Sequence, residues 1–427
     1  MPDFKLALAV GCFTSALAAC ASTDAPPGNS AAGAANGGAS AGAAGSAGAL
    51  GGSSGSVNTG AGADAGGTAD AGGTAGATGG GSSAGTGGAA PTVVCKPPDD
   101  VFSPIALLSK TGCVDAMDPK KPIASAQTYE VNSPLWSDTA DKTRAFVLPA
   151  GGKVHVRDCI ANPSACPNGT QDDGRWEFPV GSVMYKTFAF DGKLVETRLF
   201  MHLDATNWVG YSYMWNEAQT DATIADSAGA DTVFNTGTRT VPWHYPSQMD
   251  CLNCHNNAVG STLGPETAQM NRVVGDMNQI DRLAAAQVFD TAPTQPYKTA
   301  LVTPYTSQAG SPPATATVEQ RARSYLHANC GFCHRTGGNY ANFDFRYDTA
   351  FKDMNLCNAD AKKGAIANAP GKTKILVPGS PMDSVMWLRM NEADPLKGRM
   401  PQVASFVVDK DGTSVVGDWI TSVTACP

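Results

Sequence analysis

The chain has 427 residues, a formal net charge of −8 and a hydrophobic fraction of 42%. The acidic excess is spread along the chain, and the sequence has no basic stripe with interleaved aromatic residues, so nucleic acid is not an expected partner. The part beyond the low-complexity N-terminal region is long enough for two domains.

The N-terminus carries the pattern of an export signal. A weakly charged start is followed by an apolar run from Leu6 to Ala19, which is too short for a comfortable membrane span. Leu17-Ala-Ala-Cys20 resembles the bacterial lipobox, which implies cleavage before Cys20 and a lipid on its thiol. Because residue 21 is Ala rather than Asp, the general bacterial sorting pattern favours the outer membrane. The alternative is an ordinary secretory signal in which Cys20 is incidental.

We therefore expect a lipoprotein signal peptide at residues 1–19 and a tether at residues 20–94. The tether consists mostly of Gly, Ala, Ser and Thr, and such a segment has too little apolar surface to offset the entropy of its chain. It is expected to be disordered, so that a lipid at one end holds a folded body at the other in the cell envelope.

Residues 95–245 are predicted to form a β-rich domain. The run 183–190 is rich in strand-forming residues, and Asp191-Gly192 supplies the pair that a type I′ hairpin turn prefers. Residues 194–201 alternate apolar and polar side chains and should form the return strand, with 207–215 as a third strand. This order of strands predicts a meander within a small antiparallel sheet.

Two copies of Cys-X-X-Cys-His follow this region, Cys251-Leu-Asn-Cys254-His255 and Cys330-Gly-Phe-Cys333-His334. This spacing is the attachment signature of c-type haem: each thiol adds to one vinyl group, and the His lies under the iron as an axial ligand. A redox dithiol or half a zinc site are the alternatives, but a thioredoxin-like βαβ context and a second zinc knuckle are both missing nearby. We expect two covalently bound haem c groups with iron.

Residues 246–313 are expected to hold the first haem segment and a connector. Apolar residues recur at helical spacing from 270 to 290, and the Pro- and Thr-rich stretch 291–313 links the two haem-bearing units. His255 is the expected proximal ligand, while the sixth ligand stays open. The candidates, any of which is as readily structural, are His202, His244, Met201, Met270 and Met277. A vacant sixth position is also an open alternative.

Residues 314–427 are expected to hold the second haem. Thr317-Val-Glu-Gln320 has the form of a capping box that starts a helix running into Cys330, and His327 lies too near Cys330 to reach over its own haem. Met400, in Arg399-Met-Pro401, is the expected distal ligand of the iron held by His334, and Met390 is the fallback. A closing helix at 415–422 should pack across the first. This order resembles a class I cytochrome c.

The remaining cysteines indicate disulfides. Of the 12 Cys, Cys12 leaves with the signal, Cys20 carries the lipid and four belong to the two motifs. The other six allow fifteen connectivities, and spacing does not choose among them. We expect pairing in chain order, namely Cys95–Cys113, Cys159–Cys166 and Cys357–Cys426.

The folded chain resembles a family of exported di-haem c-type cytochromes, some members of which are fused to glucose/sorbosone-type quinoprotein dehydrogenases. The likeness covers nearly all of residues 99–425, including both haem motifs, and departs at Gln402, where a second Pro is expected. It implies haem binding and electron transfer, but no substrate. The matching stretches are 129–138, 178–182, 195–200, 210–216, 219–222, 245–247, 263–269, 323–330 and 399–401.

Together these observations predict an α+β protein, in which a small antiparallel β domain precedes haem-bearing helical units. The expected function is one-electron transfer at the cell envelope, as a relay for an exported quinoprotein dehydrogenase or another cytochrome. This is the role of an electron-transfer protein more than of a stand-alone enzyme. One alternative is a peroxidase-like oxidoreductase with an open site at the first haem. Another is a surface binding module in which the β domain grips a carbohydrate or a protein.

Overall fold

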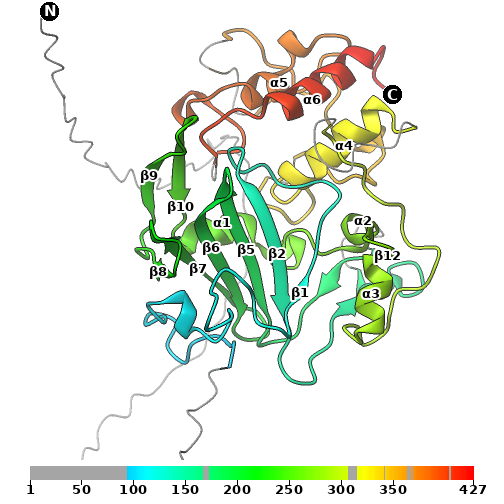
Figure 1. The fold of residues 1–427 in the computed structure, drawn as a ribbon. Helices are drawn as coiled ribbons and strands as arrows, with labels where there is room; N and C mark the ends of the chain where they lie inside the picture. The colour runs from blue at the N-terminus through cyan, green and yellow to red at the C-terminus, as the bar shows by residue number, and fades with distance from the viewer. Residues whose placement is uncertain are drawn as a thin grey trace, which may run out of the picture. The chain divides into compact units, whose positions relative to one another are not determined.

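A six-stranded antiparallel sheet forms the centre of the described chain (Figure 1). The computed structural model describes residues 94–427 except 167–172, 306–314, 341, 363–365, 367–368 and 403–404. The expected signal peptide, Cys20, nearly all of the tether and part of the connector therefore lie outside the described residues. The strands run in the order β1-β2-β5-β6-β7-β8. Their bounds are Gln127–Thr128, Asp141–Val147, Val183–Phe190, Lys193–His202, Trp208–Trp215 and Ala222–Ile224.

The central hairpin of this sheet confirms the sequence prediction. β5 and β6 pair in antiparallel fashion, and Asp191 and Gly192 between them both have positive φ, at 50° and 79°. A type I′ turn requires positive φ at both of its central residues, which explains the Asp-Gly pair. β7 follows as the predicted third strand and pairs with β6.

The two faces of the sheet bury different partners, because successive side chains of a strand point to opposite faces. On one face Tyr185, Leu199 and Tyr213 pack against the N-terminal segment, where Tyr185 donates a hydrogen bond of 2.5 Å to the carbonyl of Cys113. On the other face Phe146 and Phe200 join a second core with residues from the segment that follows the first Cys-X-X-Cys-His. The sheet is thus buried on both sides.

In the described residues, three two-stranded ribbons accompany the main sheet. They are β3 with β4, β9 with β10, and β11 with β12. The bounds are His155–Val156, Trp176–Glu177, Ala230–Asn235, Thr240–Tyr245, Val273–Val274 and Met277–Asn278.

The segment after the sheet is less helical than its sequence suggests. It contains α1 (Gln248–Cys254), α2 (Thr267–Met270) and α3 (Gln279–Ala285). The helix expected over 270–290 is therefore wrong in its first half, where β11 and β12 form a hairpin. Gly275 takes a left-handed φ of 66° in that turn, and the Asn278 side chain accepts a hydrogen bond from the Ile280 amide, so the helix begins only at 279.

Three helices dominate the C-terminal part: α4 (Val318–Asn329), α5 (Val385–Met390) and α6 (Lys410–Ser422). The predicted capping box of α4 is confirmed, since the side chains of Thr317 and Gln320 each accept a hydrogen bond from the backbone of the other. α6 packs against α4 through a core that includes Leu326, Val416 and Trp419. Short 3-10 helices cover Leu108–Lys110, Pro163–Ala165, Asn257–Val259, Phe351–Asp353, Pro381–Asp383 and Pro395–Lys397.

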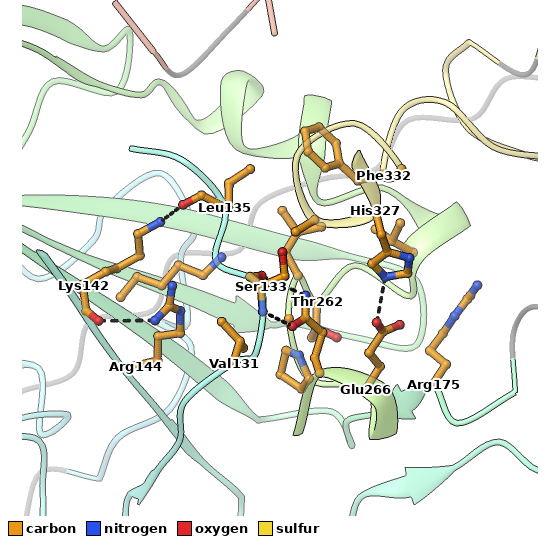
Figure 2. A pocket seen from close by; sticks show the side chains of 18 of the residues that line it. Val131, Ser133, Leu135, Lys142, Arg144, Arg175, Thr262, Glu266, His327 and Phe332 are labelled. Carbon is orange, nitrogen blue, oxygen red and sulfur yellow. Dashed lines mark hydrogen bonds and ion pairs between the residues drawn. The ribbon is translucent and has the colours of Figure 1, made fainter. Parts of the chain in front are cut away.

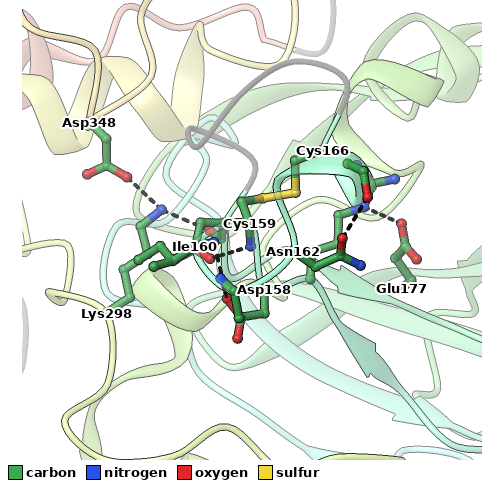
Figure 3. The surroundings of a disulfide bond; sticks show 12 residues. Asp158, Cys159, Ile160, Asn162, Cys166, Glu177, Lys298 and Asp348 are labelled. Carbon is green, nitrogen blue, oxygen red and sulfur yellow. Dashed lines mark hydrogen bonds and ion pairs between the residues drawn. A yellow bond between two sulfur atoms is a disulfide. The ribbon is translucent and has the colours of Figure 1, made fainter.

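All three expected disulfides are present, namely Cys95–Cys113, Cys159–Cys166 and Cys357–Cys426. Cys159–Cys166 closes a short loop whose surroundings include Lys298 from the connector (Figure 3). Lys298 donates to the carbonyl of Asp173 at 2.8 Å and pairs with Asp348 at 2.7 Å. This cation therefore joins the β region, the connector and the C-terminal part.

The loop before β2 ties the sheet to the C-terminal helices. Ser133 donates to the carbonyl of Ser324 in α4 at 2.8 Å, and the Trp136 amide donates to the Asn329 side chain at 2.7 Å. The buried carboxylate of Asp138 accepts the amides of Phe406 and Val407. The described residues accordingly belong to one compact unit. The architecture is an antiparallel sheet-rich region joined to a small number of helices.

Candidate functional site

The first motif lies at the end of α1. Ser247 and Asp250 form a capping box at the start of this helix, and one helical turn then places Cys251 and Cys254 on the same side. Both thiols are free, although the chain forms three disulfides elsewhere. The two sulfurs are therefore held near each other without being joined.

His255 is fixed in one orientation immediately after α1. Its Nδ1 lies 2.7 Å from the carbonyl of Ser261, so this nitrogen must carry the proton and donate it. Its ring also packs on Phe200, with 4.2 Å between centroids. Burial, with the neighbouring charges of Lys186 and Arg198, holds the pKa of His255 well below its usual value. The imidazole is consequently neutral, with the Nε2 lone pair available to a metal.

Gly210 of β7 makes room for the first motif. A Cβ atom at this position would lie 2.5 Å from the Sγ of Cys251 and 3.0 Å from its Cβ. Since real Cβ contacts are not this short, the close approach of α1 to the sheet requires glycine at 210.

A cavity of about 370 Å³ opens beside this motif, between the sheet and the loop that follows Met400. Cys251, Cys254 and His255 all line it, together with side chains of β2, β5 and β6. Of the five residues considered as sixth ligand, His244 alone lines the cavity. Its Nδ1 lies 2.6 Å from Asp231 and its Nε2 3.4 Å from Asp250.

The other four candidates lie elsewhere. Met201 packs in the core on the opposite face of the sheet, and Met270 is fully buried beside α3. Met277 is half-exposed in β12. His202 stacks on Trp208, with 4.2 Å between ring centroids, and its Nδ1 bonds the carbonyl of Phe178.

The second motif follows α4 in the same way. Cys330 ends the helix, and the His334 ring stacks on Phe343 with 4.4 Å between centroids. Burial lowers the pKa of His334 to about 4, against an opposing effect of the Tyr340 backbone, so this imidazole is also neutral near pH 7.

A largely apolar cavity of about 120 Å³ adjoins the second motif. Cys330, His334 and Met400 line it, and so does Met390, the fallback ligand, which belongs equally to the C-terminal core. The amide of Met400 donates to the carbonyl of Arg389 at 2.9 Å, which holds this loop against the end of α5. The predicted distal methionine and the predicted proximal histidine thus share one cavity.

The two motifs touch each other. The Asn256 side chain donates to the carbonyl of Phe332 at 3.2 Å. In the opposite direction, the carbonyl of Asn253 accepts the Asn339 side chain at 3.1 Å and lies 3.8 Å from the Sγ of Cys333. Asn253, between the cysteines of the first motif, therefore contacts Cys333 of the second motif directly, and the residues that follow each motif add two further bonds.

The four motif thiols are poorly suited to redox exchange. Burial raises the pKa of Cys251 and Cys333 to about 11, and that of Cys254 and Cys330 to about 12. Reactive dithiols instead depend on a lowered thiol pKa. In the described part of the chain, no group of three or more His, Cys, Asp or Glu side chains forms a metal site.

A third, smaller cavity lies between the two motifs, and we call it the intermotif cavity (Figure 2). Its volume is about 80 Å³, and it is lined by Leu263 from the chain after the first motif and Phe332 from the second. His327 also lines it. The Nδ1 of this ring accepts the amide of Tyr347 at 3.1 Å, and its Nε2 lies 2.7 Å from Glu266.

The cationic residues that line these cavities were not predicted from the sequence; they include Lys142, Arg144, Lys186 and Arg198. Part of this pattern is visible in the sequence, because Lys186 and Arg198 stand among apolar residues in the two strands of the predicted hairpin. Burial, together with Arg144 and Arg198, lowers the pKa of Lys186 to about 7.

Comparison with family models, curated proteins and solved structures gives no match for this chain. None of the helices in the described ranges is long and apolar enough to cross a membrane.

Proposed function

We propose that this chain is a di-haem c-type cytochrome that transfers single electrons at the bacterial cell envelope. The observation that carries this proposal is the contact between the second Cys-X-X-Cys-His motif and the chain directly after the first, through Phe332 and Asn256. Two haems attached there would be neighbours, as a pathway for electrons requires.

The residues around each motif fit a covalently bound haem. Cys251 and Cys254 would hold the first haem and His255 its iron, since both thiols are free and the imidazole, whose Nε2 carries no proton, lines a cavity. Gly210 gives Cys251 the space it needs.

Cys330 and Cys333 would hold the second haem, with His334 and Met400 on its iron. We further propose the organisation of a class I cytochrome c for residues 314–427. In support, α4 leads into Cys330, α6 packs against α4, and Met400 lines the same cavity as His334.

When bound, haem iron supplies the one-electron chemistry by changing between its ferrous and ferric forms. The chain's own residues orient and shield that centre. The Ser261 carbonyl fixes the tautomer of His255, and Phe343 holds the plane of His334. A thioether from Met400 favours the ferrous form and would raise the reduction potential at the second site.

The proposed setting is the outer membrane, with a lipid on Cys20 and an exported redox protein, such as a quinoprotein dehydrogenase, as partner. Substituting Cys20 by Ser should move the protein from the membrane fraction to the soluble fraction of an expressing bacterium. If the variant stayed in the membrane fraction, the lipid anchor would be refuted.

A second candidate function is peroxidase-like oxidation or reduction at the first site. One observation favours it: the first cavity, at about 370 Å³, is larger than the second, at about 120 Å³, and holds the polar group His244. A high-spin spectrum that responds to cyanide would support an open site there. Low-spin, six-coordinate signals at both irons would support the relay instead.

The direct test counts the haems. A pyridine haemochrome assay and the intact mass of the denatured protein should give two covalent haems per chain, and one in a double variant with Ser at 330 and 333. A variant with Ser at 159 and 166 loses a disulfide but should keep both haems. A wild-type mass that matches the bare polypeptide would overturn the proposal.

A further inference from the structure

Three cations stand directly opposite one another across the central sheet. Arg144 of β2 pairs in register with Lys186 of β5, and Lys186 pairs with Arg198 of β6. Like charges at directly opposed positions of an antiparallel pair repel each other and destabilise the sheet. We call these three residues the cationic row.

The two ends of the cationic row have polar partners, but its middle does not. Arg198 forms two hydrogen bonds with the carboxylate of Glu196, at 2.7 and 2.8 Å, and Arg144 donates to the carbonyl of Lys142 at 3.3 Å. The Nζ of Lys186 has no hydrogen bond or ion pair with any residue in the described ranges. A half-buried ammonium between two guanidinium groups therefore lacks a counter-charge.

The surroundings of Lys186 add positive charge. Lys142, Arg144 and Arg175 line the intermotif cavity (Figure 2). Lys186 itself and Arg335 complete its cationic lining. The carboxylate that lines this cavity, Glu266, already bonds His327 at 2.7 Å. Five cations thus surround a small space that holds one engaged carboxylate.

We infer that the intermotif cavity binds an oxyanion through Lys186, with Lys142 and Arg144 beside it. An anion there would offset the repulsion within the cationic row and occupy a space of about 80 Å³, which suits a carboxylate or an inorganic oxyanion.

Two kinds of molecule carry an oxyanion that suits this cavity. One is a haem attached at the neighbouring motif, whose carboxylate side chain would enter the cavity. This alternative rests on the proposed function. The other is a free inorganic anion such as phosphate. The haem carboxylate is favoured because Lys142 and Lys186 line both the intermotif cavity and the cavity beside Cys251.

The first measurement separates a bound anion from an empty cavity. In the purified full-length protein, Lys186→Met should lower the thermal midpoint, because the anion then loses its cation. Lys186→Arg should restore it, and Lys193→Met, at an exposed position of β6, should leave it unchanged. If no anion is bound, Lys186→Met relieves the repulsion in the row and raises the midpoint, which would overturn the inference.

The second measurement identifies the source. With a haem carboxylate in place, Lys186→Met lowers the reduction midpoint of one haem, since a nearby cation favours the ferrous form, and inorganic phosphate shows no saturable binding. With a free anion, phosphate binds the wild type saturably, and Lys186→Met weakens its affinity at least tenfold. If Lys186→Met matches Lys193→Met in both measurements, no anion site exists.

These outcomes stay separate from the proposed function. The haem count of the wild type decides the proposed function without reference to Lys186. If the wild type carries two haems and Lys186→Met has no effect, the proposed function stands and only the anion site is refuted.

Discussion

The side chain of Asn256 forms two hydrogen bonds near the contact between the motifs, one within its own segment and one to Phe332. Its oxygen accepts the amide of Ala258 at 3.0 Å, and its nitrogen donates to the carbonyl of Phe332 at 3.2 Å. The first bond shapes the chain after His255, and the second joins it to the other motif. One amide therefore couples the local geometry of the first motif to the position of the second.

Asn256→Asp should separate these two roles. Aspartate keeps the acceptor for Ala258 but loses the donor, and it places a carboxylate near the Phe332 carbonyl. We expect a loss of about 1–3 kcal/mol in the free energy of unfolding, measured in urea. Asn257→Asp introduces the same charge at an exposed neighbour and should cost much less. Equal losses in the two variants would mean that the bond between the motifs contributes nothing measurable.

Met400→Ala should lower the reduction midpoint of one haem while the protein stays folded. Loss of the thioether removes a ligand that favours ferrous iron. Redox titration followed by magnetic circular dichroism would report both the midpoint and the change of axial ligand. Met382→Ala, at an exposed methionine of the same part of the chain, is the control.

Met390 provides the competing outcome. It lines the same cavity as Met400 but also packs in the C-terminal core, so Met390→Ala should mainly reduce stability. A spectral change in Met390→Ala with none in Met400→Ala would show that the wrong methionine was assigned.

The elements that were predicted correctly are determined by a few residues that are adjacent in the sequence. Asp191-Gly192 defines a turn by its backbone preference, and Thr317 with Gln320 defines a helix start by reciprocal hydrogen bonds. Such features depend on neighbours in the sequence alone. Local signals also explain why the helix expected from residue 270 was wrong. The turn at Gly275 and the helix start at Asn278 outweigh the periodic apolar pattern.

The features that were not predicted depend on contacts distant in sequence. The opposition of Arg144 to Lys186 follows from the register of β2 with β5, which no local motif specifies. Likewise, the choice among five possible sixth ligands needs the fold, because His244 reaches the first cavity from β10 while His202 turns away from it. Sequence thus locates the chemistry of each motif but not its surroundings.

Gly210→Ala should disturb the first motif selectively. The added Cβ would lie 2.5 Å from the sulfur of Cys251, so the cysteine or the strand must shift. We expect a fraction of molecules with one covalent haem in the intact mass of the denatured protein, together with lower stability. Ser212→Ala, two residues along β7, should keep both haems because the buried Ser212 hydroxyl has no partner among the described residues. Full attachment in Gly210→Ala would contradict this account of the glycine.

Two of the disulfides, which close loops of different length, allow a test of how chain entropy contributes to stability. Cys357–Cys426 spans 69 residues, and its removal by Ser at both positions should cost about 4 kcal/mol of unfolding free energy. Cys159–Cys166 spans 7 residues, and the matching double variant should cost about 2 kcal/mol. Urea unfolding of the two variants under oxidising conditions measures the difference. Because the longer loop restricts the unfolded chain more, a larger loss from the shorter loop would mean that folded-state contacts near Cys159, rather than unfolded-state entropy, set the stabilisation.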